Sequence, residues 1–158
     1  MRARTIALCR MLTGIFFLFF GEYKVVDGAF AHGGFQKYLA DYISHDAASF
    51  YRPVLSRFVL PHAVPLGYCV GIIELLIGVS LVLGWRIRLF SVIGGLYMIN
   101  LALATWNAPG PGPVWRYFGN ELDHLPLLFL FAIFFANRAG ETWGMDGRWN
   151  AALAPHEK

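Results

Sequence analysis

The most constraining feature of the sequence is an apolar stretch, residues 66–84, that holds one charged side chain, Glu74. A stretch of this length and composition can cross the hydrocarbon core of a bilayer as a helix. Three glycines within it, Gly67, Gly71 and Gly78, stand at helical offsets that put them on one face with Glu74. Small residues let membrane helices approach closely, so we expect this face to point into a helix bundle. An ionisable group held there marks a candidate functional site.

The composition of the 158-residue chain is typical of a polytopic membrane protein. Hydrophobic residues make up 57% and charged residues 15%, whereas soluble proteins average about 45–50% and 25%. The net charge of +3 is small and spread over several segments. That distribution does not suit nucleic acid, and it fits the use of lysine and arginine in setting membrane orientation. We therefore expect contact with the lipid bilayer and none with nucleic acid.

Four apolar segments predict an all-α fold, a polytopic membrane four-helix bundle that forms a single domain over residues 1–158. The predicted helices cover about residues 5–27, 66–84, 87–106 and 122–137, and the last is short for a membrane span. The outer loop, residues 28–65, contains apolar residues at i, i+3, i+4 and i+7: Tyr51, Val54, Leu55 and Phe58. This spacing predicts an amphipathic outer-loop helix that lies on the membrane surface or covers the end of the bundle.

Arginines in the short turn at residues 84–88 indicate the orientation, because short loops carry the positive-inside signal best. We expect both termini in the cytoplasm and a multi-pass chain in the cytoplasmic (inner) membrane. One alternative is a cleavable signal peptide that ends near Ala29-Phe30-Ala31. Charged residues before that point, and glycines at seven-residue spacing (Gly14, Gly21, Gly28), favour a retained helix instead.

With this topology, every helix brings polar side chains to the outer half of the membrane, and the inner half holds almost none. At 1.5 Å per residue, Glu74 and Asn100 lie roughly 12 Å and 9 Å from the outer helix ends. Tyr97, Asn100, Ala104 and Asn107 form one stripe on the third helix. The other polar groups flank the outer ends of the first and fourth helices: Glu22, Lys24, Asn120, Glu121, Asp123 and His124.

Polar groups in a shallow intramembrane pocket suit a ligand with a polar head and an apolar tail, and a quinone has that form. Quinone reduction needs protons as well as electrons. Glu74, His124 and Asp123 are the candidate catalytic residues for moving those protons. The candidate quinone-binding residues are Lys24, Glu22, Tyr97 and Asn100. Each also has a structural alternative, as a packing acid, an interhelical hydrogen bond or an interfacial group.

Other chemistry finds little support in the sequence. The five histidines show no metal-ligand spacing, so no metal site is predicted, and a haem held by His62 and His124 is only weakly supported. There is no nucleotide-binding or nucleophile motif, so a redox role requires a partner oxidoreductase subunit. Cys9 and Cys69 fall near opposite membrane sides, too far apart for a disulfide, and we expect both thiols to be buried.

Three motifs resemble the DoxX/DoxD-like family of small membrane proteins. They are Arg10 to Gly21-Glu22-Tyr23-Lys24, then Glu74 to Gly84 followed by Arg86 or Arg88, and last Gly144-Met145-Asp146. The resemblance implies a four-helix protein of a bacterial or archaeal inner membrane, and it maps Lys24 and Glu74 onto the family pattern. It also implies a link to thiosulfate:quinone oxidoreductase or to thiol and oxidative-stress systems.

The leading hypothesis is therefore an integral membrane subunit of a quinone-linked oxidoreductase system. A small proton-coupled transporter could use the same buried acid, and a non-catalytic membrane anchor could recruit a partner protein through the outer loop. The sequence leaves open whether the chain is catalytic on its own and whether it forms a homo-oligomer.

Overall fold

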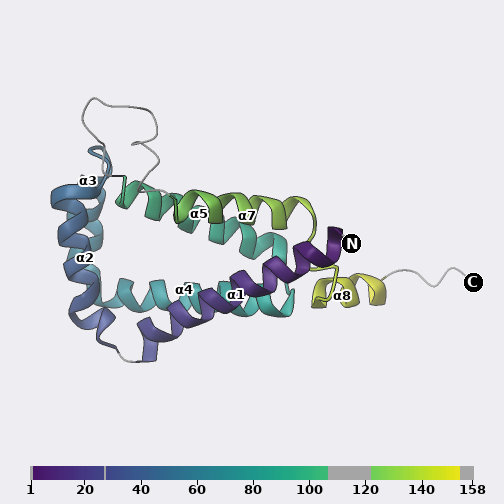
Figure 1. Cartoon of the computed structure of the whole chain (residues 1–158). Coiled ribbons are helices and arrows are strands. Elements are labelled where there is room, and N and C mark those ends of the chain that lie inside the picture. The colour runs from purple at the N-terminus through teal and green to yellow at the C-terminus, as the bar shows by residue number, and fades with distance from the viewer. Residues whose placement is uncertain (1, 27, 107–121, 154–158) are drawn as a thin grey trace, which may run out of the picture.

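The computed structural model describes residues 2–26, 28–106 and 122–153, and every regular element within them is a helix. Four helices run along a common direction: α1 (Arg2–Val26), α4 (Ala63–Leu83), α5 (Ile87–Ala104) and α7 (His124–Ala136) (Figure 1). The predicted all-α membrane fold is confirmed. Three helical stretches of the described chain are long and apolar enough to cross a membrane, Arg2–Val26, Arg52–Leu83 and Ile87–Ala104, while α7 is a shorter apolar helix.

The bundle has two distinct ends. The start of α1, the turn between α4 and α5, and helix α8 (Met145–Leu153) lie together at what we call the terminal end (Figure 1). The opposite end, the loop end, is covered by residues 28–62, which we call the capping segment. It stands across the bundle and consists of η1 (Phe30–Gly34), α2 (Phe35–Asp41), η2 (Tyr42–Asp46), α3 (Arg52–Val54), η3 (Leu55–Val59) and η4 (Leu60–His62).

Helices α1 and α4 are antiparallel and pack backbone against backbone through glycines. A Cβ atom added at Gly21 of α1 would lie 2.8 Å from the Leu75 nitrogen and 2.9 Å from the Gly71 oxygen. One added at Gly71 would lie 2.7 Å from a Val25 methyl group. The predicted glycine face of the second span therefore does point into the bundle. It packs against the glycines of the first span.

Aromatic side chains fill the terminal half of the bundle. The ring of Phe131 on α7 occupies the space that a side chain at Gly94 of α5 would need, with ring atoms as close as 2.3 Å to the position of the missing Cβ. The buried core there is continuous across all four helices: Phe17, Ile77, Leu81, Ile87, Phe90, Met98, Phe131, Phe134 and Ala139. This packing joins the α1–α4 pair to the α5–α7 pair at the terminal end.

Arg10 corrects the expectation that the half of the bundle at the terminal end is nearly free of polar groups. Its side chain is fully buried, and it donates hydrogen bonds to the carbonyl oxygens of Leu81, at 2.6 Å, and Trp143, at 3.4 Å. Gly84 lies against it, at a positive φ of 66° that ends α4. No sequence pattern indicated this burial, because the partners of Arg10 are backbone carbonyls of distant residues.

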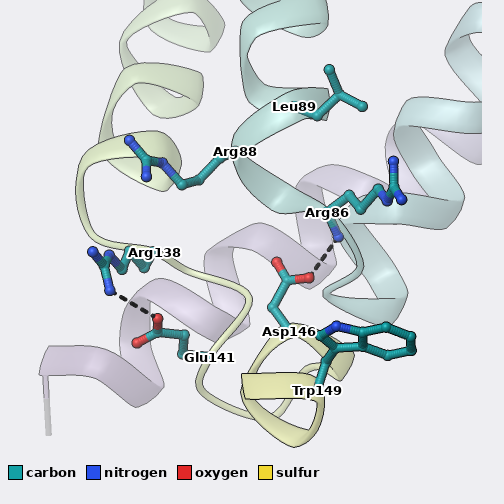
Figure 2. A pocket seen from close by; sticks show the side chains of 7 residues that line it. All are labelled: Arg86, Arg88, Leu89, Arg138, Glu141, Asp146 and Trp149. Atoms are coloured by element: carbon teal, nitrogen blue, oxygen red, sulfur yellow. Dashed lines mark hydrogen bonds and ion pairs between the residues drawn. The ribbon is translucent and has the colours of Figure 1, made fainter. Parts of the chain in front are cut away.

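The segment after α7 returns to the α4–α5 turn. Asp146 of α8 accepts hydrogen bonds from the backbone N–H groups of Arg86, at 2.7 Å, and Ile87, at 2.9 Å (Figure 2). The Asp146 N–H in turn donates to the Gly84 carbonyl at 2.9 Å. The carboxylate thus caps the first turn of α5, where unsatisfied N–H groups and the helix dipole favour negative charge.

The outer-loop helix was predicted either to lie on the membrane surface or to cover the end of the bundle. The capping segment does cover the end of the bundle. Only part of the predicted apolar face is buried, however: Leu55 is buried and Tyr51 is half-buried, but Val54 and Phe58 are exposed. The pattern failed here because η3 and η4 run directly into α4, which begins at Ala63 rather than at residue 66. The continuation into α4 fixes which side of this helix faces the bundle.

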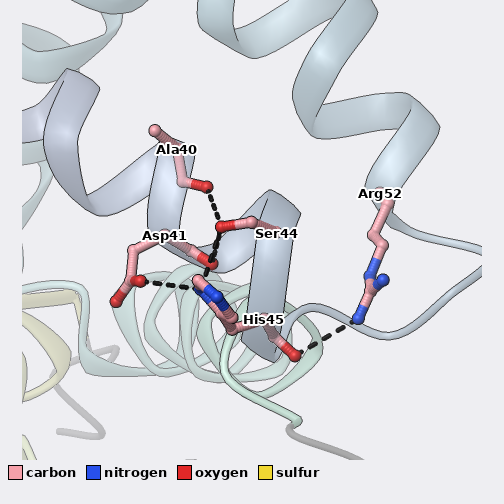
Figure 3. Close-up of polar contacts among 5 residues, drawn as sticks. All are labelled: Ala40, Asp41, Ser44, His45 and Arg52. Atoms are coloured by element: carbon pink, nitrogen blue, oxygen red, sulfur yellow. Dashed lines mark hydrogen bonds and ion pairs between the residues drawn. The ribbon is translucent and has the colours of Figure 1, made fainter.

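Polar contacts hold the bend of the capping segment. His45 Nδ1 lies 3.0 Å from Asp41 Oδ1, and the Ser44 hydroxyl donates to the Ala40 carbonyl at 2.7 Å (Figure 3). Arg52 reaches back to donate to the carbonyls of Ala47, at 2.9 Å, and His45, at 3.2 Å. These contacts close the turn between η2 and α3 and lie outside the bundle, so we assign them a structural role.

Candidate functional site

A cavity of about 1220 Å³ lies beneath the capping segment and is lined by residues of α1, α4, α5 and α7. Its wall is mainly apolar, with a few polar side chains on α1, α4, α5 and at the start of α7. Two wall residues on α1, Phe16 and Phe20, are 63% and 60% exposed. The cavity is therefore open along α1 toward the surroundings of the helices, which for a membrane span is lipid.

Glu74 is the centre of the polar group in this cavity. Its Oε1 atom lies 2.5 Å from Lys24 Nζ and accepts a hydrogen bond from the Tyr97 hydroxyl at 2.6 Å. The Glu74 residue is 4% exposed, so the carboxylate is buried, as predicted from its helix face. A buried charge needs a partner, and Lys24 supplies one.

Side-chain direction explains why these three residues meet. Cα–Cβ bonds of a helix tilt toward its N-terminus. Glu74 on α4 therefore leans toward the loop end, whereas Lys24 on α1 and Tyr97 on the roughly parallel α5 lean away from it. Lys24 follows Gly21 by one turn and Glu74 follows Gly71 by one turn, so the glycine contact between the helices sets the spacing of the ion pair.

Aromatic rings hold the lysine head beside the carboxylate. Lys24 Nζ lies 5.3 Å from the ring centre of Phe30 in the capping segment and 5.9 Å from that of Phe20 on α1. Both distances fall within the range of a cation–π interaction. The ammonium is thereby fixed between α1, α4 and the capping segment, and it still lines the cavity.

The second oxygen of the carboxylate, Glu74 Oε2, is buried and has no hydrogen-bond partner in the described structure. Both donors, Lys24 and Tyr97, point at Oε1 instead. An unsatisfied buried acceptor costs free energy comparable to a lost hydrogen bond. A water molecule or a donor group on a ligand would satisfy it.

Asn100 lines the same cavity and accepts a hydrogen bond from the Tyr51 hydroxyl of the capping segment. Burial raises the pKa of Tyr51 above its ordinary value, which keeps the hydroxyl protonated and able to donate. The contact ties the capping segment to α5 at the rim of the cavity. The apolar spacing around Tyr51 predicted a helix face but gave no sign of this partner.

His124 and Asp123 lie where α7 begins, and both line the cavity. His124 Nδ1 is 3.3 Å from the hydroxyl of Thr105 at the end of α5. Asp123 is exposed and makes no side-chain cap to α7. Together they supply the polar part of the cavity wall at the start of α7.

Glu22 does not join the other predicted site residues. It is exposed and does not line the cavity, because it stands two positions before Lys24 in the helix and therefore on another face of α1. Three residues of the predicted polar cluster, Asn107, Asn120 and Glu121, lie outside the described residues. The expectation of buried thiols is wrong: Cys9 and Cys69 are free and exposed, and both line the cavity.

Comparison with known proteins identifies the family. The family model described as DoxX matches residues 5–107, which include α1, the capping segment, α4 and α5. The match thus covers Lys24, Glu74 and Tyr97 but ends before α7. Searches of curated proteins and of solved structures gave no match.

Proposed function

The chain belongs to the DoxX family of membrane proteins, and from this premise we propose that it is the membrane subunit of a quinone-linked oxidoreductase system. In this proposal the cavity binds the quinone, and Glu74 handles its protons. Membership of the family supports the proposal because some members are linked to quinone oxidoreductases. The observation that carries it is the buried Lys24–Glu74–Tyr97 cluster in the wall of an otherwise apolar cavity.

The shape and chemistry of the cavity suit such a ligand. An apolar wall that is open along Phe16 and Phe20 would admit a molecule with an isoprenoid or alkyl tail from the lipid. A quinone carbonyl accepts hydrogen bonds, and the Lys24 ammonium and Tyr97 hydroxyl are the donors beside it. A hydroquinone hydroxyl donates, and the unsatisfied Oε2 of Glu74 is a matching acceptor.

The proposed proton chemistry balances with electrons from a partner subunit. Reduction of the quinone takes two electrons from that subunit and two protons, and it yields the hydroquinone. Glu74, charged in its pair with Lys24, takes a proton from the cavity rim, where Asp123 and His124 are the candidate donors, and passes it to the quinone. A second transfer through the same carboxyl group supplies the second proton and leaves Glu74 charged again. Oxidation of a hydroquinone runs the same steps in reverse.

The transporter alternative gains no support from the described part of the chain. A transport path has to continue past Glu74 toward the terminal end, and that half of the bundle is filled by side chains with almost no exposure, including Ile77, Leu81, Phe131 and Phe134. Arg10 is buried there as well, but it is hydrogen-bonded to backbone carbonyls rather than facing a channel.

Quinone titration of the purified full chain in lipid nanodiscs tests the proposal. We expect saturable binding of a short-tailed quinone to the wild type. We expect Glu74→Gln, which keeps the size of the side chain and removes its charge and proton, to slow the proton uptake that accompanies reduction of the bound quinone by dithionite.

Glu22→Gln is the matched control, since it removes the same charge from the surface of α1 outside the cavity. The control should behave as the wild type does in both binding and proton exchange. Absence of saturable binding in the wild type, or equal effects of the two substitutions, would overturn the proposal.

A further inference from the structure

A second pocket, of about 470 Å³, lies at the terminal end of the bundle, away from the cavity (Figure 2). Three arginines line it: Arg86 and Arg88 at the start of α5, and Arg138 after the end of α7. Figure 2 shows Arg88 and Arg138 on one side of Asp146, while the Arg86 side chain extends away on the other. Residues from the α4–α5 turn and from the end of the chain thus build one pocket together.

Aromatic rings hold two of these arginines in place. The Arg88 guanidinium lies 4.6 Å from the ring centre of Phe135 on α7, and that of Arg86 lies 5.6 Å from the ring of Trp85. Within residues 2–26, 28–106 and 122–153, neither guanidinium forms an ion pair with a carboxylate. Stacking leaves the N–H groups in the guanidinium plane available as donors.

The two carboxylates of the pocket do not cancel this positive charge. Asp146 accepts hydrogen bonds from the backbone N–H groups of Arg86 and Ile87, so its charge is directed at the start of α5. Glu141 forms an exposed ion pair with Arg138, at 3.5 Å, and so offsets the charge of one arginine. Three guanidinium groups against two carboxylates leave the lining with a net positive charge.

The surroundings place the pocket at the level of the lipid headgroups. The apolar helix α5 begins at Ile87, directly after Arg86, and the apolar helix α7 ends at Ala136, directly before the segment that carries Arg138. Exposed tryptophans surround the same end of the bundle: Trp85, Trp143 and Trp149. Tryptophan with arginine at the end of an apolar helix is typical of the membrane–water interface.

We propose that this pocket binds the phosphate group of an anionic phospholipid. Arg88 and Arg138 donate to the phosphate oxygens, and guanidinium groups suit this task because their donors match the geometry of phosphate. The acyl chains then lie along the apolar surface of α5 and α7, where Leu89 lines the pocket and is exposed. Basic pockets between membrane helices bind anionic headgroups in this way.

Thermal unfolding of the full chain in neutral detergent, titrated with phosphatidylglycerol or phosphatidylcholine, tests the assignment. We expect phosphatidylglycerol to raise the unfolding temperature saturably and phosphatidylcholine to raise it less. Removal of both charges in Arg88→Gln/Arg138→Gln should weaken the apparent affinity for phosphatidylglycerol by roughly 25-fold, because each basic residue near an anionic surface contributes about fivefold. Each variant is compared with its own lipid-free unfolding temperature, so a general loss of stability does not imitate the effect.

The control variant Lys37→Gln/Arg57→Gln removes two charges from exposed positions in the capping segment. It should retain the affinity of the wild type for phosphatidylglycerol. Equal losses in the two double variants would show attraction by net charge alone and would overturn the site. A separate titration with inorganic phosphate distinguishes a free anion from a lipid: stabilisation by phosphate at millimolar concentration, equal to that by the lipid, would overturn the lipid assignment.

Discussion

At the scale of single residues, the described site depends on one carboxylate oxygen that receives two donors. Glu74 Oε1 lies within hydrogen-bond distance of both Lys24 and Tyr97, which come from two different helices. In an apolar environment these hydrogen bonds are strong when every charged group has its partner, whereas a charge left without a partner is strongly destabilising. The three residues therefore stabilise the fold, and in the proposed function they also hold the group that transfers protons.

The ion pair makes a prediction about stability. Lys24→Met should lower the free energy of unfolding by about 3–5 kcal/mol, because it leaves the buried Glu74 charge without its partner. Lys24→Met/Glu74→Leu should be destabilised less than the single variant, because it removes both charges. Chemical unfolding in detergent micelles measures both values, and additive effects of the two substitutions would show that the residues do not interact.

The sequence was sufficient to place Glu74 but not to find all of its surroundings. Its position on the glycine face predicted that it points into the bundle, and the structure confirms this. The contact with Tyr97 joins two residues 23 positions apart, on helices whose relative rotation no periodicity defines. The Tyr51–Asn100 contact escaped prediction for the same reason, since it joins residues 49 positions apart.

At the scale of the helices, glycines set the distance between α1 and α4, and this distance sets the ion pair. Gly21→Ala should lower the stability by about 1–3 kcal/mol, because the new methyl group meets the backbone of α4 and has to push the helices apart. The same shift should weaken the Lys24–Glu74 contact and any activity that depends on it. Unfolding measurements together with quinone binding report both effects.

Gly95→Ala is the matched control on α5. A Cβ atom there would meet only a Leu128 methyl group, at an ordinary 3.5 Å. This substitution should be neutral or slightly stabilising, because alanine favours a helix more than glycine does. Similar losses at Gly21 and Gly95 would contradict the assigned close contact between α1 and α4.

The cap of α5 makes a second prediction at this scale. Asp146→Ala removes the acceptor of two backbone N–H groups and should cost about 0.5–2 kcal/mol, the usual range for a lost helix cap. Hydrogen exchange at the Ile87 amide should become faster. Asp123→Ala is the control at the start of α7, where the carboxylate makes no cap, and exchange there should stay as it is.

The ends of the helices were predictable where local residues set them and not where distant residues do. Helix α4 ends at Leu83, within one residue of the predicted end at residue 84, and Gly84 follows it in a left-handed conformation. The cap of α5 is supplied by Asp146, 60 positions away from Arg86. Only the family resemblance, through Gly144-Met145-Asp146, singled out this residue, and it carried no information about what the residue contacts.

At the scale of the whole molecule, the two halves of the bundle differ in packing. The terminal half has an aromatic core and a fully buried, hydrogen-bonded Arg10. The cavity opens beneath the capping segment, where Glu74 lines it, and its wall continues along α1 as far as Cys9. The packed core and the cavity thus meet at shared residues, Phe17 and Met98.

Whole-chain organisation was predicted in outline because hydrophobicity alone determines which segments enter a membrane. The converging polar groups predicted a shallow pocket, but its size and its wall along α1 could not be predicted, since they depend on how the helices separate. Arg10 was missed for a related reason: its burial requires the carbonyls of Leu81 and Trp143, which only the folded chain brings together.

Photolabelling with an azido-quinone in nanodiscs tests the central claim most directly, because it shows where the ligand lies. The proposed function predicts labels on the cavity-facing parts of α1 and α5, near Lys24 and Tyr97, that an excess of unlabelled quinone prevents and Glu74→Gln reduces. Labels that no competitor displaces, on outward residues such as Leu96 and Phe129, would contradict it, because both are exposed and lie outside the cavity wall.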